Sequence, residues 1–567
     1  MDDIRVSTEG MGVDAPISRR VGATKSRSGC KTCKIRKVKC GEEKPSCFRC
    51  TSTGRKCEFE DDRRSPPTLT PTLLLSSSPD AGRRERRAFE YYFQNVARHL
   101  AGGMEIDFWT NVIPQICRSE PAVWDGMIAI STLFEYPNQS LDFPLLRDRR
   151  KSNTLNQIQR EALTWYSRSI SSVHSQIERG IADPYIALIS CALFICVETI
   201  QGRTEEALQL FRQGVTLIGD LRTHITLGHV SKSRQNLLKD AIIPLFSRLA
   251  SISLTVSGTQ PGPIFTFLEN NPTAGFTSLE HARSSITVIS ADVLLFEREA
   301  HSHLREIGAH CYVSIDMLNR RKNLQHRVAE WYIAYTKFHQ GNNRQHSTPQ
   351  IRVQHEPLLI IYYVAISIIL SVCLTPLEIV YDDHLAEFGI IVEQAQLSLA
   401  TSAMTDGSQP PFTFEAGVGV PLFLTALKCR DWRLRRKALE LLRQAPQMQG
   451  LFKCAPSAFM AEAFMNMEES YSLALRDSTL ATSPTSGAEG DHPGDPQILV
   501  PEEARIYYYC IFRPGEWYPP GVNEEDVVKF GRSLDQLYLH FSRNEFDLET
   551  KTWRQNFECI PFGADLM

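Results

Sequence analysis

Six cysteines lie between residues 30 and 57 of this 567-residue chain, and their spacing repeats. The unit C-x2-C-x6-C occurs twice, and six residues separate the two copies. The cysteines are Cys30, Cys33, Cys40, Cys47, Cys50 and Cys57. Thiolates at such spacings are the ligands of structural zinc sites. Because about 30 residues cannot build a sufficient hydrophobic core, we expect this segment to fold around metal.

The number of sulfurs constrains the number of metals. Two tetrahedral Zn²⁺ need eight thiolates unless two sulfurs bridge both ions, and then six suffice. Cys30 and Cys47 are each the first cysteine of one copy of the unit, so the repeat indicates that they are the bridging pair. No histidine precedes His99, so no imidazole is available nearby. We interpret the segment as a six-cysteine cluster of two Zn²⁺. The alternative is one zinc held by Cys30, Cys33, Cys47 and Cys50, and metal analysis distinguishes the two.

Disulfide bonds are a further alternative for these cysteines. Disulfides need an oxidising compartment. The N-terminus begins Met1-Asp2-Asp3-Ile4 and has no apolar run, so the sequence predicts no signal peptide. The other nine cysteines, from Cys117 to Cys559, lack C-x2-C spacing. We expect them to be reduced and buried as small apolar side chains.

Basic residues are concentrated around the cysteines, whereas the rest of the chain is acidic. Residues 18–64 contain 15 Lys and Arg and 6 Asp and Glu, a net charge of +9, while the whole chain carries −3. Two Zn²⁺ with six thiolates carry a formal charge of −2, so most of the positive charge is left over. A basic module on an acidic chain is typical of nucleic-acid binding.

The residues between the cysteines are also informative. The first half of the cluster reads Gly29-Cys30-Lys31-Thr32-Cys33-Lys34-Ile35-Arg36-Lys37-Val38-Lys39-Cys40. With the second half, Lys44-Pro45-Ser46-Cys47-Phe48-Arg49-Cys50 through Cys57, it resembles the fungal Zn2Cys6 binuclear-cluster DNA-binding domain. That family has basic residues at the positions of Lys34, Arg36, Lys37 and Lys39 and a proline at Pro45. The resemblance implies a zinc-dependent DNA-binding domain over residues 26–60 of a nuclear transcription factor.

The resemblance also implies how the module reads double-stranded DNA. A short helix from Cys33 to Lys39 would point its C-terminal end into the major groove over a CGG triplet. Lys37 falls at the principal base-contacting position, with Arg36 beside it, and both side chains suit the O6 and N7 acceptors of guanine. Four further residues are expected to hold phosphates, which give affinity and register but no sequence information. They are Lys34, Lys39, Lys44 and Arg49. The alternative for each of these four is simple solvation.

Tail and linker segments flank this module. Residues 1–25 are expected to form a disordered tail, and the Pro- and Ser-rich residues 61–84 a flexible linker. No heptad repeat of a dimerising coiled coil follows the cysteines. The protein therefore binds DNA as a monomer or forms a homodimer through its large domain. The run 83–87, Arg-Arg-Glu-Arg-Arg, either aids nuclear import or begins a charged helix.

Residues 85–567 show mainly helical periodicity. We expect a mostly α protein, in which a small zinc-cluster domain precedes a large all-α domain of helical hairpins such as 157–179, 184–200 and 204–219. Loose patterns at 187–214 and 429–469 are similar to the regulatory region of filamentous-fungal Zn2Cys6 factors. The uncharged stretch 357–377 is expected to be a buried core helix rather than a membrane span, because its polar residues insert poorly. Residues 477–497 are expected to be a disordered insertion.

The large domain lacks the usual sequence signatures of an enzyme. It has no G-x-S-x-G, no Walker loop and no H-E-x-x-H, and Gly417-Val418-Gly419 does not continue as a dinucleotide motif. His301, His303, His310 and Cys311 match no standard zinc spacing. We therefore expect no enzyme but a regulator of RNA polymerase II transcription that contacts DNA and the transcription machinery, with a metabolic or secondary-metabolite gene set as its candidate target. The alternative is an enzyme or scaffold that uses the cluster only structurally.

Overall fold

The structure is a computed structural model, and two compact units divide the chain near residue 74. It describes residues 29–57, 82–102, 107–137, 155–226, 230–257, 262–267, 275–307, 313–342, 349–481, 499–515, 518–528 and 536–563. The expected tail, nearly all of the expected linker and most of the expected insertion at 477–497 lie outside these ranges. Residues 83 and 84 begin a helix, and residues 477–481 end one.

The first unit contains two short helices, α1 (Lys31–Ile35) and α2 (Phe48–Thr51). Each begins directly after the first cysteine of one copy of the repeat. Five of the six cysteines are buried, and they form the core cluster of this unit, with Cys57 packed against them. No aliphatic or aromatic side chain belongs to this cluster among the described residues. The cysteines thus occupy the place of a hydrophobic core.

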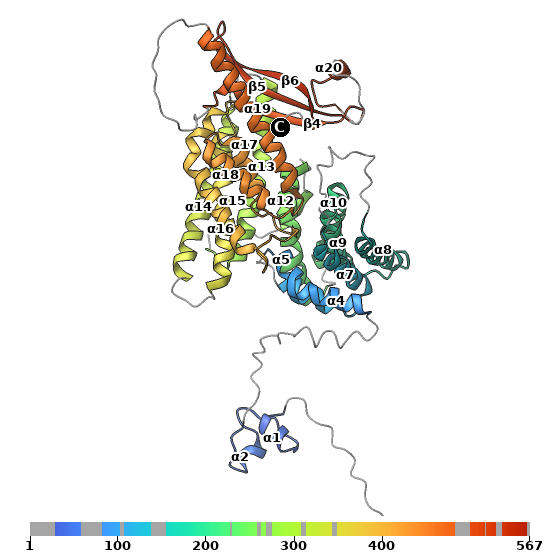
Figure 1. Cartoon of the computed structure of the whole chain (residues 1–567). Coiled ribbons are helices and arrows are strands. Elements are labelled where there is room, and N and C mark those ends of the chain that lie inside the picture. Colours follow the sequence, from blue (N-terminus) through green and yellow to red (C-terminus); the bar gives the residue numbers. More distant parts are fainter. Residues whose placement is uncertain are drawn as a thin grey trace, which may run out of the picture. The chain divides into compact units, whose positions relative to one another are not determined.

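The first part of the larger unit is built of short and medium helices (Figure 1). They are α4 (Arg83–Tyr91), η1 (Tyr92–Val96), α5 (Ala97–Leu100), η2 (Phe108–Val112), α6 (Ile113–Ile116), α7 (Pro121–Glu135), α8 (Gln157–Glu178), α9 (Pro184–Ile200), α10 (Thr204–Thr226), α11 (Lys232–Leu237), η3 (Leu238–Ile242), α12 (Ile243–Ser257) and η4 (Gly262–Phe267). The arginine run at 83–87 forms the first turns of α4, as the helical alternative predicts.

The three helices expected from sequence, α8, α9 and α10, are present. The bounds of α8 and α9 are nearly those expected, whereas α10 extends to Thr226 rather than ending at residue 219. Asn156 caps α8, since its side chain accepts a hydrogen bond from Gln159 N at 2.7 Å. Gly180 and Gly202 follow α8 and α9 with φ of 67° and 76°, a left-handed conformation that suits glycine. These caps make the chain reverse, so the expected hairpin arrangement is confirmed here.

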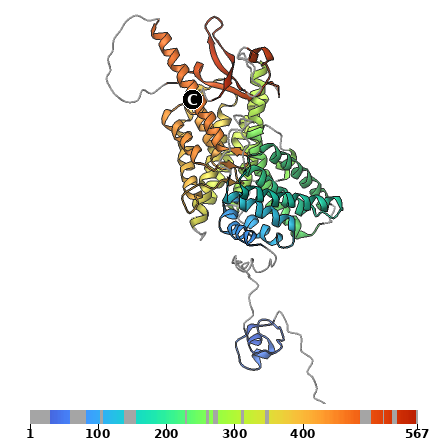
Figure 2. The same cartoon turned by 45° about the vertical axis from the view of Figure 1, so that its right-hand side comes forward.

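The second part contains the longest helices of the chain (Figure 2). They are α13 (Leu279–Ile307), α14 (Ile315–Asn342), α15 (Pro349–Val372), η7 (Ile379–His384), α16 (Leu385–Ser402), α17 (Gly419–Lys428), α18 (Trp432–Gln444) and α19 (Cys454–Ala481), followed by η8 (Glu502–Ala504) and α20 (Glu524–Val528). The packing of α13, α14 and α15 centres on Trp331, whose Nε1 donates to Ala282 O at 2.8 Å.

Helix α15 contains most of the uncharged stretch 357–377. Its side chains at Leu359, Ile361 and Ile368 are fully buried against other helices, and the helix ends before Pro376. This position agrees with a core helix. Among the described residues, no helix combines the length and the apolar character that crossing a membrane would require.

Two small sheets interrupt the helices. In the first, β1 (Phe412–Thr413) pairs in parallel with β2 (Met448–Gln449), which pairs antiparallel with β3 (Phe452–Lys453). In the second, β4 (Ile506–Phe512), β5 (Leu537–Asp547) and β6 (Thr552–Phe562) form an antiparallel sheet in that order. The mostly helical fold class is confirmed, but the expectation of helices to the end of the chain missed this sheet. The first eight residues of β5 are all buried, so the strand lacks the alternation that signals a half-exposed strand.

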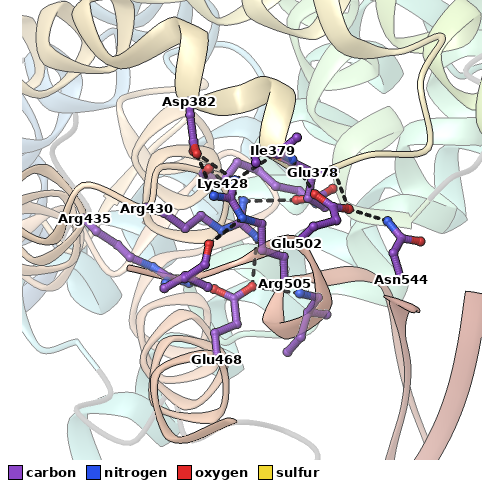
Figure 3. Close-up of polar contacts among 12 residues, drawn as sticks. Glu378, Ile379, Asp382, Lys428, Arg430, Arg435, Glu468, Glu502, Arg505 and Asn544 are labelled. Carbon is purple, nitrogen blue, oxygen red and sulfur yellow. Dashed lines mark hydrogen bonds and ion pairs between the residues drawn. The ribbon is translucent and has the colours of Figure 1, made fainter. Parts of the chain in front are cut away.

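A buried ionic network connects the C-terminal segment to the helices (Figure 3). Glu378 accepts hydrogen bonds from Lys428 Nζ at 2.6 Å and from Arg430 at 3.0 Å. Arg430 also donates to Glu468 of α19 at 2.8 Å, and Glu468 pairs with Arg435 of α18 at 2.7 Å. Three of the five residues lie in the stretch 429–469 that sequence reasoning singled out. This network accounts for the presence of both acidic and basic residues in the stretch 429–469.

The C-terminal segment completes this network. Arg505 donates to both carboxylate oxygens of Asp382, at 2.9 and 2.6 Å. Glu502 accepts from the backbone N–H of Glu378 at 2.9 Å and from the side chain of Asn544 on β5 at 2.5 Å. Four carboxylates therefore meet one lysine and three arginines, and the formal charges of the network balance.

Candidate metal and nucleic-acid-binding site

The two halves of the cysteine unit have the same local structure. Cys30 and Cys47 occupy the N-cap positions of α1 and α2. The backbone N–H of Cys30 points at Cys40 Sγ at 3.3 Å, and that of Cys47 points at Cys57 Sγ at 3.3 Å. The sequence repeat is therefore also a structural repeat.

Four sulfurs at the centre of the unit fit a tetrahedral metal. The Sγ atoms of Cys30, Cys33, Cys47 and Cys50 lie within 4.8 Å of one another. Four of their separations are 3.7 to 3.9 Å. A Zn–S bond of about 2.3 Å in a tetrahedron places sulfurs about 3.8 Å apart. The donor set therefore fits zinc both in chemistry and in spacing, and these four sulfurs taken alone correspond to the one-zinc alternative.

The remaining two cysteines interact with this group. Cys40 interacts with the sulfurs of Cys33 and Cys47. Cys57 interacts with the sulfurs of Cys30, Cys47 and Cys50. Both outer cysteines therefore lie in contact with the central sulfurs. A single zinc would leave both outer sulfurs without a role, whereas two bridged ions use all six.

Helix α1 ends earlier than the sequence predicts. A helix from Cys33 to Lys39 was expected, but α1 spans Lys31–Ile35. Lys37 has a φ of 54°, which ends the helix. Its N–H bonds to Lys34 O and that of Val38 to Cys33 O, both at 3.2 Å, the pattern of a Schellman cap. The extent of the expected helix is wrong, because the chain leaves the helical conformation at Lys37.

The second half closes in the same way but with glycine. Gly54 has a φ of 61°, its N–H bonds to Thr51 O at 3.1 Å, and that of Arg55 bonds to Cys50 O at 3.0 Å. Gly54 follows Cys47 by seven residues, as Lys37 follows Cys30. The two residues occupy equivalent positions, and only the first carries a side chain.

The basic residues predicted to contact DNA lie on the outside of the unit. Those with exposed side chains are Lys34, Lys37, Lys39, Lys44 and Arg49. Arg36 differs, because it is partly buried and its Nη1 lies 3.3 Å from Thr53 Oγ1 and 3.5 Å from Arg49 O. The structure therefore places Arg36 against the second half of the cluster rather than freely beside Lys37.

Sequence reasoning missed one contact that joins the two halves and one that holds the loop between them. Thr32 Oγ1 donates to Lys56 O at 2.8 Å. Glu43 Oε2 accepts from the backbone N–H of Phe48 at 3.1 Å, at the start of α2. An acidic residue near a helix N-terminus is a recognisable signal, but here the link spans a loop that contains Pro45. These contacts fix the loop between the two copies of the repeat.

The other candidate sites from sequence do not form metal or nucleotide sites in the described residues. His301 stacks on Tyr507 with ring centroids 5.7 Å apart, and His310 and Cys311 lie outside the described residues. Gly419 N donates to Gln449 Oε1 at 2.7 Å, and a Cβ on Gly417 would lie 2.5 Å from that side chain. The two glycines thus allow close packing against Gln449.

Comparison with known proteins agrees with the geometry. Residues 28–66 match the family model of the fungal Zn(2)-Cys(6) binuclear cluster domain, whose members bind two zinc ions. The chain is 24% identical over 443 residues to the aspercryptin biosynthesis cluster-specific transcription regulator atnN of Emericella nidulans, which covers 70% of this chain and 66% of that protein. No solved structure matches.

Two further relatives match over shorter stretches. An uncharacterized transcriptional regulatory protein of Schizosaccharomyces pombe is 26% identical over 140 residues, or 20% of this chain and 25% of that protein. Transcription factor lfc1 of Flammulina velutipes is 44% identical over 52 residues, or 8% and 18%. The match therefore spans just under two thirds of the first relative and a quarter or less of the other two.

Proposed function

We propose that this chain is a sequence-specific DNA-binding regulator of RNA polymerase II transcription in the nucleus, because residues 28–66 match the fungal Zn(2)-Cys(6) binuclear cluster domain. The observation that carries the proposal is the exposed cationic surface around the cysteines. Residues 30–57 contain nine Lys and Arg and two Glu. A metal site with only a structural role does not require this excess of positive charge, whereas binding to DNA phosphates does.

Bound zinc would supply the cross-links that a hydrophobic core supplies elsewhere, through Cys30, Cys33, Cys40, Cys47, Cys50 and Cys57. Held by the zinc-bound cysteine cluster, Lys37 presents its ammonium group to the O6 and N7 atoms of guanine in a CGG-type triplet. Lys34, Lys39, Lys44 and Arg49 hold phosphates and set the register. Arg36 contributes at the same tip of the domain, where it also contacts the second half of the cluster.

The helical unit is proposed to be the regulatory part of the molecule. It contacts the transcription machinery, and a homodimer would form through it. The name of the relative that matches most of this chain refers to a biosynthetic gene cluster. That name supports a metabolic or secondary-metabolite gene set as the target of this protein.

The proposal is tested by titrating the full-length protein with a duplex that contains CGG and with one in which the triplet is permuted, at about 50 and 200 mM salt. Four phosphate contacts predict an affinity loss of about 100-fold over this range. The CGG duplex should bind more tightly at both concentrations. Equal affinity for the two duplexes would favour the alternative, in which the cluster is only structural.

A variant at a predicted phosphate contact distinguishes phosphate contacts from base contacts. Lys44→Ala should weaken both duplexes alike and lower the slope of log affinity against log salt by about 1. A change in the preference between the duplexes, with no change in slope, would contradict the role assigned to Lys44.

A further inference from the structure

The helical unit contains a cavity of about 190 Å³ where its first helices meet the segment after α16. One wall comes from η1 and α5, a second from the C-terminal turns of α16, and a third from β1, β2 and the residues that follow β1. Segments some 300 residues apart in sequence thus enclose one space. Neither the proposed DNA contacts nor the zinc cluster uses it.

The wall that closes the cavity beyond α16 is held by its own hydrogen bonds. Met404 N donates to Ser408 O at 2.8 Å, and Gly407 N donates to Met404 O at 2.9 Å. Gln409 donates to Leu399 O at 2.7 Å and accepts from Ser402 Oγ at 2.9 Å. These contacts order the segment 403–410, so the cavity has a formed wall rather than a loose loop.

The lining is polar and rich in hydroxyl groups. Five lining residues carry a hydroxyl, and three carry a carboxamide. They are Ser398, Thr401, Ser402, Thr405 and Thr413, with Gln94, Asn95 and Gln449. An apolar cavity of this size would contain no water, whereas this polar lining offers hydrogen bonds to a polar ligand.

Three ionisable side chains line the cavity, and their arrangement favours an anion. Glu415 is the sole acid in the lining, and it is buried between Arg248 and Arg283, so its charge is already matched. Arg98 lies at the exposed edge and has no hydrogen bond or ion pair among the residues that the structure describes. Burial, together with Arg98, lowers the pKa of His99, which disfavours a positive charge on this ring.

We propose that this cavity binds a small organic carboxylate of about six to ten non-hydrogen atoms. Arg98 would pair with the carboxylate, since a guanidinium matches its two oxygens, and the hydroxyls of Ser398 and Thr405 would bind the remaining polar groups. The size follows from the volume, because a protein cavity of about 150 Å³ takes up benzene. The inference goes beyond the proposed DNA binding and does not depend on it.

The test is isothermal titration of the full-length, zinc-loaded protein with succinate, 2-oxoglutarate and benzoate, and with succinamide and benzamide as neutral counterparts. At least one carboxylate should bind with a Kd below about 1 mM, and its amide about tenfold or more weakly. No binding by any of the three carboxylates, or equal binding by acid and amide, would overturn the proposal.

Variants connect the binding to this cavity. Arg98→Ala should weaken the carboxylate about tenfold or more, while Arg118→Ala, an exposed arginine outside the lining, should leave its affinity unchanged. Ala403→Leu fills the space from another wall and should also reduce binding. Unchanged affinity in both Arg98→Ala and Ala403→Leu would refute the site. Preference for CGG is measured separately, so failure of one proposal leaves the other standing.

Discussion

At the scale of single residues, the backbone at Lys37 is the most informative detail of the zinc unit. Gly54 occupies the equivalent position in the second half, where a left-handed φ involves no Cβ. A side chain in this conformation costs about 1–2 kcal/mol. The first half nevertheless has a lysine there. A strained residue held by its surroundings is a reason to expect function, and here the expected function is base contact.

Two substitutions at Lys37 separate strain from recognition. Lys37→Gly removes the side chain and the strain together, whereas Lys37→Ala removes the side chain alone. Both should lower the preference for CGG by about 1–3 kcal/mol. Only Lys37→Gly should make the zinc unit more resistant to chelator, by about 1 kcal/mol. Duplex competition and the chelator midpoint measure the two effects. If the Lys37→Gly variant keeps the preference for CGG, the base-contacting role assigned to Lys37 is contradicted.

Two neighbouring glutamates on α19, Glu468 and Glu469, allow the stability contributions of a buried and a surface ion pair to be compared. Burial by itself raises the pKa of Glu468, but Arg430 and Arg435 lower it to about 2. Glu468→Gln would remove the charge partner of buried Arg435 and leave buried Arg430 with Glu378, so it should destabilise the protein by about 3–5 kcal/mol. Glu469 pairs with Arg436 near the surface at 2.9 Å, and Glu469→Gln should cost less than about 1 kcal/mol.

Urea unfolding of both variants, followed by circular dichroism at 222 nm, checks this difference. Similar losses in the two variants would show that the network of Glu468 contributes no more than a surface pair. Glu468→Ala would also remove the acceptor of the hydrogen bond from Ile506 N, which is 2.8 Å long, so it should increase the access of protease to the C-terminal sheet.

At the scale of elements, local signals decided what could be predicted. The helices at 157–178, 184–200 and 204–226 have amphipathic or apolar periodicity, and the first two also have capping residues at their starts and glycines just after their ends. Each signal lies within a few residues of the feature that it produces. Strand β5 has no such signal, because its buried residues depend on α19 and on the strands at either side. Tertiary contacts, and not local preference, determine its conformation.

Helix α7 provides a prediction about pH. Burial raises the pKa of Asp125 to about 6, although Arg168 lies 3.2 Å away and lowers it. The folded protein therefore holds this proton more tightly than the unfolded chain does. Stability falls as the pH rises from about 4 to 6 and remains lower above that range.

Asp125→Asn removes this ionisation. It should stabilise the protein by about 2 kcal/mol at pH 7.5 and by less at pH 5. Asp220→Asn, at an exposed position on α10, should change little at either pH. Urea midpoints at the two values measure the effect. An Asp125→Asn variant that is less stable than the wild type at pH 7.5 would show that the pair with Arg168 outweighs burial.

At the scale of the whole molecule, the sequence reveals the zinc unit far better than the large domain. Six cysteines and their spacing determine the small domain, because all its essential contacts lie within 28 residues. In the large domain Glu378 meets Arg430, and Arg98 shares a cavity with Thr413. Such pairs are separated by tens to hundreds of residues, so the periodicity of one sequence cannot reveal them.

Metal dependence of base preference is the most direct test of the account. Zinc should be removed from the full-length protein with a chelator and then returned in steps, while binding to the CGG duplex and the permuted duplex is followed by fluorescence anisotropy. The account predicts that preference for CGG disappears on chelation and returns fully at two Zn²⁺ per chain. Preference that survives complete removal of zinc, or returns fully at one ion per chain, would contradict it.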